Sequence, residues 1–375
     1  MLAHRYLAFV LGGWLLLLSL TGGLLLFRDD LDRALNPGLL MNGSDAANDG
    51  IGASEVLAAV ATHYPGSLVE VLRWPRVSGA AYQVVLRLDG RRTIGARRLE
   101  AFFDAATGRW LGERDPLARS LAAPALMATV HDLHHRLLLG NGGKDLVGSA
   151  GLVLSLMLVS GMVLAFPTLR RSTLSRAVGI RWSAGFKRQT YDAHRSVGVL
   201  LGLWLLLSAL TGTAMAWPEY ARDLTGVFSR VRALPVMPWQ PAARAPLDLD
   251  ALLALSRSHR PQASVTEVHF GGSRLAPVLV YLRAPGDRQR LGDTRLFHHA
   301  VTGELLLAVS PEQRNAGETM LAWIEPLHTG GWSTAIGRPL MLVVALVPAW
   351  MALTGGLVWW FKRAGRRVAS QRAAR

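Results

Sequence analysis

The sequence contains no cysteine, and this absence narrows the chemistry that the chain can support. Disulfides, iron–sulfur clusters, thiolate-ligated haem and haem attached through a C-x-x-C-H motif are all excluded. Histidine is the remaining side chain that commonly ligates a redox metal, and the chain has 11 histidines. Any redox centre would therefore use histidine ligands or a diffusible cofactor.

Charged residues are also scarce, at 18% of the chain, and they are missing from the interiors of four long apolar runs. A helix needs about 20 apolar residues to cross a hydrocarbon core of ~30 Å. The four runs reach that length, at about 6–27, 146–167, 196–217 and 339–361. We therefore predict an α-helical membrane protein with four transmembrane helices. No small-x-small cleavage site follows the first run, so we predict that it is retained and is not a signal peptide.

Acidic residues are almost absent from two segments that carry the net charge of +15. Residues 168–195 hold seven Arg or Lys against Asp192 alone, and residues 362–375 hold six with no acid. Residues 28–130 and 218–335 are nearly balanced, with twelve basic against twelve and eleven acidic residues. The positive-inside rule then places both termini and the basic loop in the cytoplasm. Because the basic clusters adjoin membrane spans, nucleic acid is not expected as a partner.

The chain repeats itself. HRYLAFVLGGWLLLLSLTG runs from His4 to Gly22, and HRSVGVLLGLWLLLSALTG runs from His194 to Gly212. A second set of residues matches at a slightly larger offset. His134 matches His328 ahead of the returning spans, and Ser160-Gly161 matches Thr354-Gly355 near the ends of those spans. Two copies of one unit with two spans each have parallel topology and a pseudo-twofold axis along the membrane normal. Equivalent residues can then meet across that axis.

The two outer segments repeat as well. Residues 51–64 and 247–260 are expected to be helices that end before Pro65 and Pro261. Each is followed by three alternating, strand-like runs, with a Thr-Gly turn in the third. We expect two small α+β domains. The first repeat is predicted to consist of helix 1 (1–27), the first outer domain (28–130) and a histidine segment with helix 2 (131–167), followed by the basic loop (168–193). The second repeat consists of helix 3 (194–217), the second outer domain (218–327) and a histidine segment with helix 4 (328–361), followed by the basic tail (362–375).

The His-Arg pairs at span starts, Asn36-Pro37 after the first span and Leu-His before the returning spans form a pattern that resembles the PepSY-associated transmembrane helix family. Within it, the chain is most similar to iron-regulated inner-membrane ferrisiderophore reductases, over nearly its whole length. The resemblance implies PepSY-like periplasmic domains and a haem protein of the bacterial inner membrane that passes electrons outward to ferric siderophore. The chain departs from the pattern at Ala8, where the second copy has Gly198, and at His135.

Two histidine pairs are the candidate axial ligands of haem b, with two haems expected. His4 and His194 form the inner pair, and His134 and His328 form the outer pair. A histidine can also lie at a membrane interface or in a surface loop only because it is polar. His131 and His135 are alternative outer ligands, because they share a helix face with His134.

Small and basic residues supplement these pairs. Gly22 and Gly212 are expected at the level of the outer pair, and Gly161 and Gly355 at that of the inner pair, where a missing side chain could admit a flat macrocycle. Close helix packing alone would also use such glycines. Arg5 and Arg195 could pair with haem propionates or simply anchor the helices inside. The remaining strand histidines, His269, His298 and His299, are expected to face solvent.

The predicted function is a ferric-siderophore reductase that releases Fe(II), whose weaker affinity for hard oxygen ligands frees the metal. No G-x-G-x-x-G motif follows a strand, so electrons would come from quinol or a separate cytoplasmic reductase. Two other functions stay open. A metal or siderophore transporter would need polar groups near the bilayer midplane, where these spans have only Ser and Thr. A haem-free sensor or regulatory module would be colourless.

Overall fold

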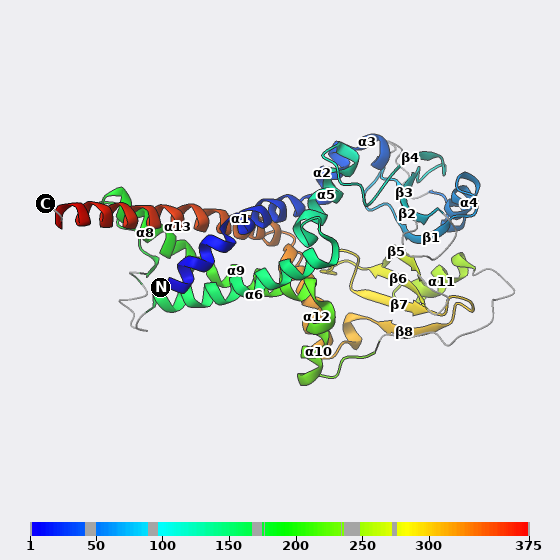
Figure 1. Cartoon of the computed structure of the whole chain (residues 1–375). Helices are drawn as coiled ribbons and strands as arrows, with labels where there is room; N and C mark the ends of the chain where they lie inside the picture. Colours follow the sequence, from blue (N-terminus) through cyan, green and yellow to red (C-terminus); the bar gives the residue numbers. More distant parts are fainter. Residues whose placement is uncertain are drawn as a thin grey trace. The chain divides into compact units, whose positions relative to one another are not determined.

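The computed structural model describes residues 2–41, 50–88, 97–166, 175, 177–233, 235, 248–271 and 276–373. Arg170, Arg171 and Arg176 of the basic loop lie outside these residues. The chain forms two compact units (Figure 1). We call Met1–Phe27, Val130–Ala221 and Ile324–Arg375 the helical unit, and Arg28–Thr129 with Arg222–Trp323 the sheet unit.

The helical unit contains the apolar helices. Among the described residues, three segments are long and apolar enough to cross a membrane: His4–Leu25 of α1 (Leu2–Leu25), α6 (Gly140–Ala165), and Gly337–Gly365 of α13 (Gly337–Ala373). A fourth span exists if α8 (Phe186–Leu200) and α9 (Gly202–Ala216) are counted as one bent helix. Three of the four predicted runs are therefore single helices, and the chain is a membrane protein by their length and composition.

The third predicted span, 196–217, is not a single helix but falls on two helices that meet the length and hydropathy requirement together. The chain bends by 57° between α8 and α9, and Leu201 lies at the break. Glycine at position 202 weakens the helix there. A Cβ on Gly202 would lie 3.1 Å from the Cε of Met162, so the glycine also permits a close approach to α6.

The interior of the helical unit is apolar and comes from four helices. Leu11 and Leu15 of α1 pack with Leu154 of α6, Leu205 of α9 and Val344 of α13 in one buried cluster. In Figure 1 these helices run alongside one another. Since lipid is as apolar as this interior, tight packing and a few hydrogen bonds must hold the helices together. The hydroxyl of Ser19, for example, donates to the backbone oxygen of Ala345.

Shorter helices connect the apolar helices to the strands. These are α2 (Arg28–Leu35), α3 (Pro37–Leu40), α5 (Ala123–Arg136), α10 (Pro218–Phe228), η1 (Pro311–Gln313) and α12 (Ala316–Thr329). The expected break in GNGGKD lies instead just before it, at Leu137 and Leu138, whose φ angles are 52° and 60°. GNGGKD forms the first turns of α6, where a Cβ on Gly143 would collide with the backbone oxygen of Arg136.

The sheet unit is built on one antiparallel sheet of eight strands, in the order β4-β3-β2-β1-β5-β6-β7-β8. The strands are β1 (Leu68–Arg73), β2 (Tyr82–Arg87), β3 (Arg98–Phe103), β4 (Trp110–Arg114), β5 (Ser264–Phe270), β6 (Val278–Arg283), β7 (Thr294–His298) and β8 (Leu305–Val309). Each outer segment thus has four strands, not three. The third predicted run folds back into a hairpin because Gly108 and Gly303 adopt φ angles of 71° and 72°, which glycine tolerates.

The two expected outer domains share this sheet. Strands β1 and β5 pair antiparallel, with Leu72 opposite Val268. These two residues occupy the same place in the two halves, so the sheet is related to itself by a twofold rotation through this pair. The prediction of two separate small sheets is corrected, because each half covers the exposed strand edge of the other.

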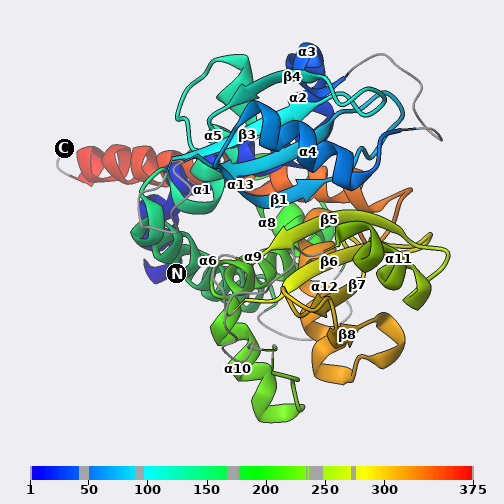
Figure 2. The same cartoon turned by 90° about the vertical axis from the view of Figure 1, so that its right-hand side faces the viewer.

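Two amphipathic helices cover one face of the sheet. They are α4 (Ala53–His63) and α11 (Leu249–His259), which lie across the near face in Figure 2. Val56 of α4 and Leu253 of α11 are buried against strand residues such as Leu72 and Val268. Alternation along β1 and β5 then directs Arg73 and Glu267 to the opposite face, since adjacent strand residues point to opposite sides.

Candidate functional site

Each of the four predicted ligand histidines makes the same contact with another helix. In each case Nδ1 of the ring lies within hydrogen-bond distance of a Ser or Thr hydroxyl. The pairs are His4 with Ser160 at 3.1 Å, His194 with Thr354 at 2.9 Å, His134 with Thr21 at 3.0 Å and His328 with Thr211 at 3.2 Å. His4 and His194 thus lie at Ser160 and Thr354, and His134 and His328 lie at Thr21 and Thr211.

The hydroxyl groups determine which ring nitrogen carries the proton. Each hydroxyl donates its hydrogen to a backbone carbonyl of its own helix: Ser160 to Met157, Thr354 to Trp350, Thr21 to Leu17 and Thr211 to Leu207, all at 2.8 Å. The hydroxyl oxygen is then available to accept from the ring, which favours the neutral imidazole tautomer with its proton on Nδ1. In His328 the backbone oxygen of Ser208, 3.0 Å from Nδ1, favours the same tautomer. Within the described residues, no hydrogen bond to Nε2 of these rings is found, which leaves its lone pair for a ligand.

Glycine follows each of these hydroxyl residues and makes room for the ring. A Cβ on Gly22 would lie 2.9 Å from Cε1 of His134, and a Cβ on Gly212 would lie 3.0 Å from Cε1 of His328. The matching values are 3.2 Å between Gly161 and His4, and 3.3 Å between Gly355 and His194. From the sequence, a macrocycle was expected in this space. The structure places the imidazole itself there.

The outer pair meets across the helical unit. The ring centroids of His134 and His328 are 6.5 Å apart, and the ring planes are inclined at 51°. Neither of the alternative ligands is placed in this way. His131 and His135 lie against each other, with ring centroids 5.7 Å apart. Of the three histidines on α5, His134 is therefore the one whose ring faces His328.

The two arginines that follow the inner histidines have different surroundings. Arg195 donates to the backbone oxygens of Ala177 and Gly179 at 3.0 and 2.9 Å, and pairs with Asp192 at 3.1 Å. Its guanidinium therefore holds the end of the basic loop. The guanidinium carbon of Arg5 lies 5.1 Å from the ring centre of its neighbour Tyr6. The predicted contact of both arginines with propionates stays a prediction.

Two tryptophans of the helical unit have unused donors. Nε1 of Trp14 and Nε1 of Trp332 are buried and have no hydrogen-bond partner among the described residues. Trp332 stacks on Trp204 with centroids 6.0 Å apart. A buried indole N–H without an acceptor costs free energy. Trp332 could not be singled out from the sequence, because only its place in the fold makes it unusual.

The strand histidines correct one expectation. His298 and His299 are buried and do not face solvent. Nε2 of His298 bonds Ser256 at 3.0 Å, and its Nδ1 bonds the backbone oxygen of Gly303 at the same distance. His299 accepts from the backbone N–H of Thr302 at 3.1 Å. Their place in the hairpin at Gly303, and not strand alternation alone, buries both rings.

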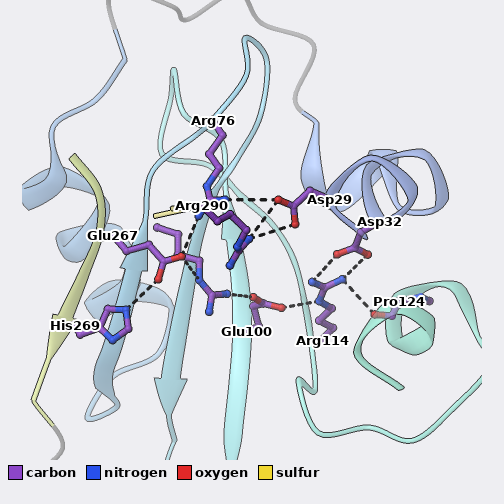
Figure 3. Close-up of polar contacts among 10 residues, drawn as sticks. Asp29, Asp32, Arg76, Glu100, Arg114, Pro124, Glu267, His269 and Arg290 are labelled. Carbon is purple, nitrogen blue, oxygen red and sulfur yellow. Dashed lines mark hydrogen bonds and ion pairs between the residues drawn. The ribbon is translucent and has the colours of Figure 1, made fainter. Parts of the chain in front are cut away.

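A chain of alternating charges, which was not predicted from the sequence, crosses the face of the sheet opposite α4 and α11. Arg114 of β4 bonds Asp32 and Glu100 (Figure 3). Arg73 of β1 contacts Glu100 and Glu267. Both glutamates are buried, with 6% and 3% of their side chains exposed. Asp32 is on α2, and the other partners lie on four different strands. Arg73 of β1 and Glu267 of β5 are far apart in the sequence, and the pairing of these two strands brings them together.

A cavity of about 600 Å³ opens between α8 and α13 in the helical unit. Its walls carry Lys187, Arg188, Tyr191 and Lys362, together with Phe186 and Val358. Tyr191 lies under the cations, with the ammonium of Lys362 5.8 Å from its ring centre. Tyr191 and His194 are both on α8, three residues apart, so one wall of the cavity is about one helical turn from His194.

These features define an integral membrane protein with a histidine-lined helical unit and a separate unit built on an antiparallel sheet. The chain belongs to the family described as the PepSY-associated TM region, which matches residues 1–362. It is also similar to an uncharacterized protein of Pseudomonas aeruginosa, with 26% identity over 262 residues, covering 62% of this chain and 63% of the relative. The chain therefore spans less than two thirds of the length of this curated relative.

Proposed function

We propose that the protein is a haem-containing oxidoreductase of the bacterial inner membrane. It would pass electrons from the cytoplasmic side or the quinol pool to ferric siderophore in the periplasm and release Fe(II). In this proposal the four spans form two parallel repeats and both termini are cytoplasmic. The sheet unit then consists of two PepSY-like halves in the periplasm.

The observation that carries the proposal is the contact of Nδ1 of each of the four histidines with a Ser or Thr hydroxyl. A metal ligand must present an unprotonated nitrogen, and a hydrogen bond from the other nitrogen fixes the tautomer and the ring orientation. Here four hydroxyl groups accept from Nδ1 and leave Nε2 available. Interfacial histidines without a ligand would have no need of this arrangement four times.

The spacing of the outer pair fits two histidines that would hold one metal ion. A metal–nitrogen bond of about 2 Å, added to about 1.1 Å from Nε2 to the ring centre, gives roughly 6.2 Å between two ring centres that share a metal. The observed separation of His134 and His328 is 6.5 Å. Both rings are also held by hydroxyls from other helices, so the pair is already oriented without the metal.

The inner histidine pair lies near one end of α1, and the outer histidine pair lies near its other end. His4 and Thr21 are both on α1, and the rise of about 1.5 Å per residue separates them by roughly 25 Å. Haem bound to each pair would supply one-electron carriers near the two faces of the membrane. The apolar residues between the pairs exclude water, and Trp14 lies in that interval on α1. The buried N–H groups of Trp14 and Trp332 could donate to a polar group of such a cofactor.

The electron donor would act at the inner pair. Because the chain has no dinucleotide-binding motif, the donor is quinol or a separate cytoplasmic reductase. The cavity lined by Lys187, Arg188 and Lys362 has one wall about one helical turn from His194 and offers a place for the donor to approach. Its positive charge would attract an acidic surface or an anionic group on the donor.

The test is an absorption spectrum of the detergent-purified protein, oxidised and then reduced with dithionite, with haem quantified per chain. Wild type is compared with His194→Ala and His328→Ala, and His259→Ala in the sheet unit is the matched control. We expect two b-type haems in wild type and in the control, and loss of one in each ligand variant. A colourless wild type would contradict the proposal and leave the transporter or the haem-free sensor.

A further inference from the structure

The charge chain on the sheet has an exposed end that differs from its buried part. From Glu267 the chain continues to Arg76, then to Asp29, then to Arg290 (Figure 3). The distances are 3.3 Å, 3.6 Å and 3.3 Å. Asp29 is 41% exposed and Arg290 is 48% exposed, so solvent reaches this end. Both halves of the sheet unit contribute to it.

Positive charge is in excess at this end. Arg76 and Arg290 share the single carboxylate of Asp29, and Arg28 lies next to it in the sequence. Arg28 makes no ion pair or hydrogen bond with any residue of the described part of the chain. Burial, followed by the like charge of Arg290, lowers the pKa of Arg76 to about 10 and also lowers the pKa of Arg28. Arg28, Arg76 and Arg290 thus lie near the carboxylate of Asp29, and the second carboxylate that contacts Arg76, that of Glu267, is already shared with Arg73.

Guanidinium groups at such a density need more acceptors than Asp29 supplies. Each offers five N–H donors in a planar fork, which suits carboxylate and other oxyanions, whereas a carboxylate has only about four acceptor positions. A desolvated cation without a partner costs free energy, and an incoming anion would remove that cost. Asp29 already occupies the place that the oxygen atoms of a ligand would take.

The fold of the sheet does not require an excess of positive charge at this end of the charge chain. Strands β1 and β5 pair around Leu72 and Val268, so Arg73 is equivalent to His269, and Glu267 is equivalent to Val71. The twofold relation of the sheet would have been kept with apolar residues at all four places. Arg73 and Glu267 thus have no counterpart of the same charge in the other half, so the twofold pairing of the strands does not account for their charges.

We propose that Arg28, Arg76 and Arg290 form a binding site for an anionic ferric chelate, one whose iron is wrapped by catecholate or carboxylate oxygens and which carries net negative charge. The assignment rests on the proposed function for the identity of the ligand as a ferric chelate, and on the guanidinium cluster for its charge. Asp29 acts as an internal competitor that holds the guanidinium groups in place until the ligand displaces it.

The experiment measures binding by titration calorimetry on the purified full-length protein in detergent. The probes are two gallium(III) complexes, which cannot be reduced: one with a tricatecholate chelator, which is triply negative, and one with a trihydroxamate chelator, which is neutral. The variants are Arg76→Gln, Arg290→Gln and Asp29→Asn. The matched control is Arg87→Gln, because Arg87 is paired with Glu70 on the same sheet, away from the cluster.

We expect tighter binding of the anionic complex than of the neutral one. Arg76→Gln and Arg290→Gln should each weaken it about tenfold, Asp29→Asn should tighten it roughly threefold, and Arg87→Gln should change it less than twofold. Equal affinity for the two complexes would overturn the inference. So would loss of binding in Asp29→Asn to the same extent as in the arginine variants, which would make the cluster a structural clamp only.

Failure of this inference and failure of the proposed function give different results. Gallium binding requires neither haem nor electron transfer, and the absorption spectrum of each variant reports haem independently. A coloured protein with no preference for the anionic complex overturns the anion site and leaves the oxidoreductase. A colourless protein that prefers the anionic complex, with the expected effects of the variants, supports the anion site and overturns the redox proposal.

Discussion

The two units use internal repetition differently. In the helical unit, both copies keep the same polar contact, so that four histidines donate to four hydroxyls in the same manner. In the sheet unit, both copies keep the strand order and the apolar core, but the charged residues differ between them. The two copies therefore keep the same residue types at the histidine–hydroxyl contacts, and they differ at the charged residues of the sheet.

The prediction with the largest expected effect concerns the charged residues that differ between the two halves of the sheet unit. Glu267→Ala removes the carboxylate shared by Arg73, Arg76 and His269, and leaves Arg73 with Glu100 alone in a partly buried setting. We expect a loss of about 3–5 kcal/mol in the stability of the sheet unit. Val71→Ala, at the equivalent place in the other half, should cost about 1 kcal/mol. Hydrogen exchange of the β1 and β5 amides measures both, and equal effects would contradict the comparison.

The next prediction concerns the histidine–hydroxyl contact that occurs in both copies of the helical unit. Thr21→Val and Thr211→Val remove the hydroxyl oxygens that accept from His134 and His328. Since partners of this kind typically change metal affinity about 10–100-fold, we expect a similar loss of haem affinity at the outer site in both variants. Haem retention during titration with a competing haem-binding protein measures it. An effect in one variant but not in the other would show that the two copies are not equivalent.

The apolar helices and the histidine pairs could be predicted from the sequence, because both depend on local patterns that occur twice. Membrane spans require long apolar runs, and superposing the two copies of the repeat aligns His4 with His194 directly. The Ser/Thr-Gly steps were also located correctly at the level of each pair. What they do could not be predicted, since the contact of Gly22 with the His134 ring depends on the packing of α5 against α1.

The charge chain and the bend could not be predicted for a related reason. Arg73 and Glu267 come from opposite halves of the sequence, and nothing in either local sequence indicates that β1 pairs with β5. The bend at Leu201 occurs inside an apolar run that looks continuous, and the close approach to Met162 that accompanies it is a tertiary contact. Long-range pairing and helix contacts therefore account for most of what sequence patterns missed.

A smaller effect distinguishes steric fit from helix packing in general. Gly22→Ala and Gly212→Ala place a methyl group about 3 Å from an imidazole carbon, which should cost about 1–2 kcal/mol and lower haem content at the outer site. The control is Gly12→Ala, also on α1, where a Cβ has nothing within 4 Å. That change should leave haem content unaltered, and it favours the helix by up to about 1 kcal/mol. Haem per chain is the readout, and loss in the control as well would attribute the effect to helix packing.

The prediction with the smallest expected effect concerns the stability of the sheet unit as a function of pH. Arg232 is the counterpart of Asn36 in the sequence, at the same offset that relates Leu72 of β1 to Val268 of β5. Asn36 donates to the backbone oxygen of Ala123 at 3.0 Å, whereas Arg232 forms an ion pair with Glu318 at 2.7 Å. Asn36 also donates to the carboxylate of Asp32 at 2.8 Å, but Asn36 is itself uncharged, so an ion pair at this position occurs in the second half only.

Hydrogen bonds from Arg232 lower the pKa of Glu318 to about 2, against its burial. A carboxyl whose pKa is depressed on folding stabilises the fold above its unfolded pKa of about 4.3, and that stabilisation is lost as pH falls toward 2. Because Arg232 is partly exposed, we expect only about 1 kcal/mol. Arg232→Gln should lower the melting temperature at pH 6 and have little effect near pH 2, whereas Asn36→Ala should lower it equally at both. Arg232 also donates to the backbone oxygens of Ala308 and Gln313 at 3.4 and 3.2 Å. An effect of Arg232→Gln that persists near pH 2 would show that these contacts, and not the ion pair with Glu318, account for its contribution.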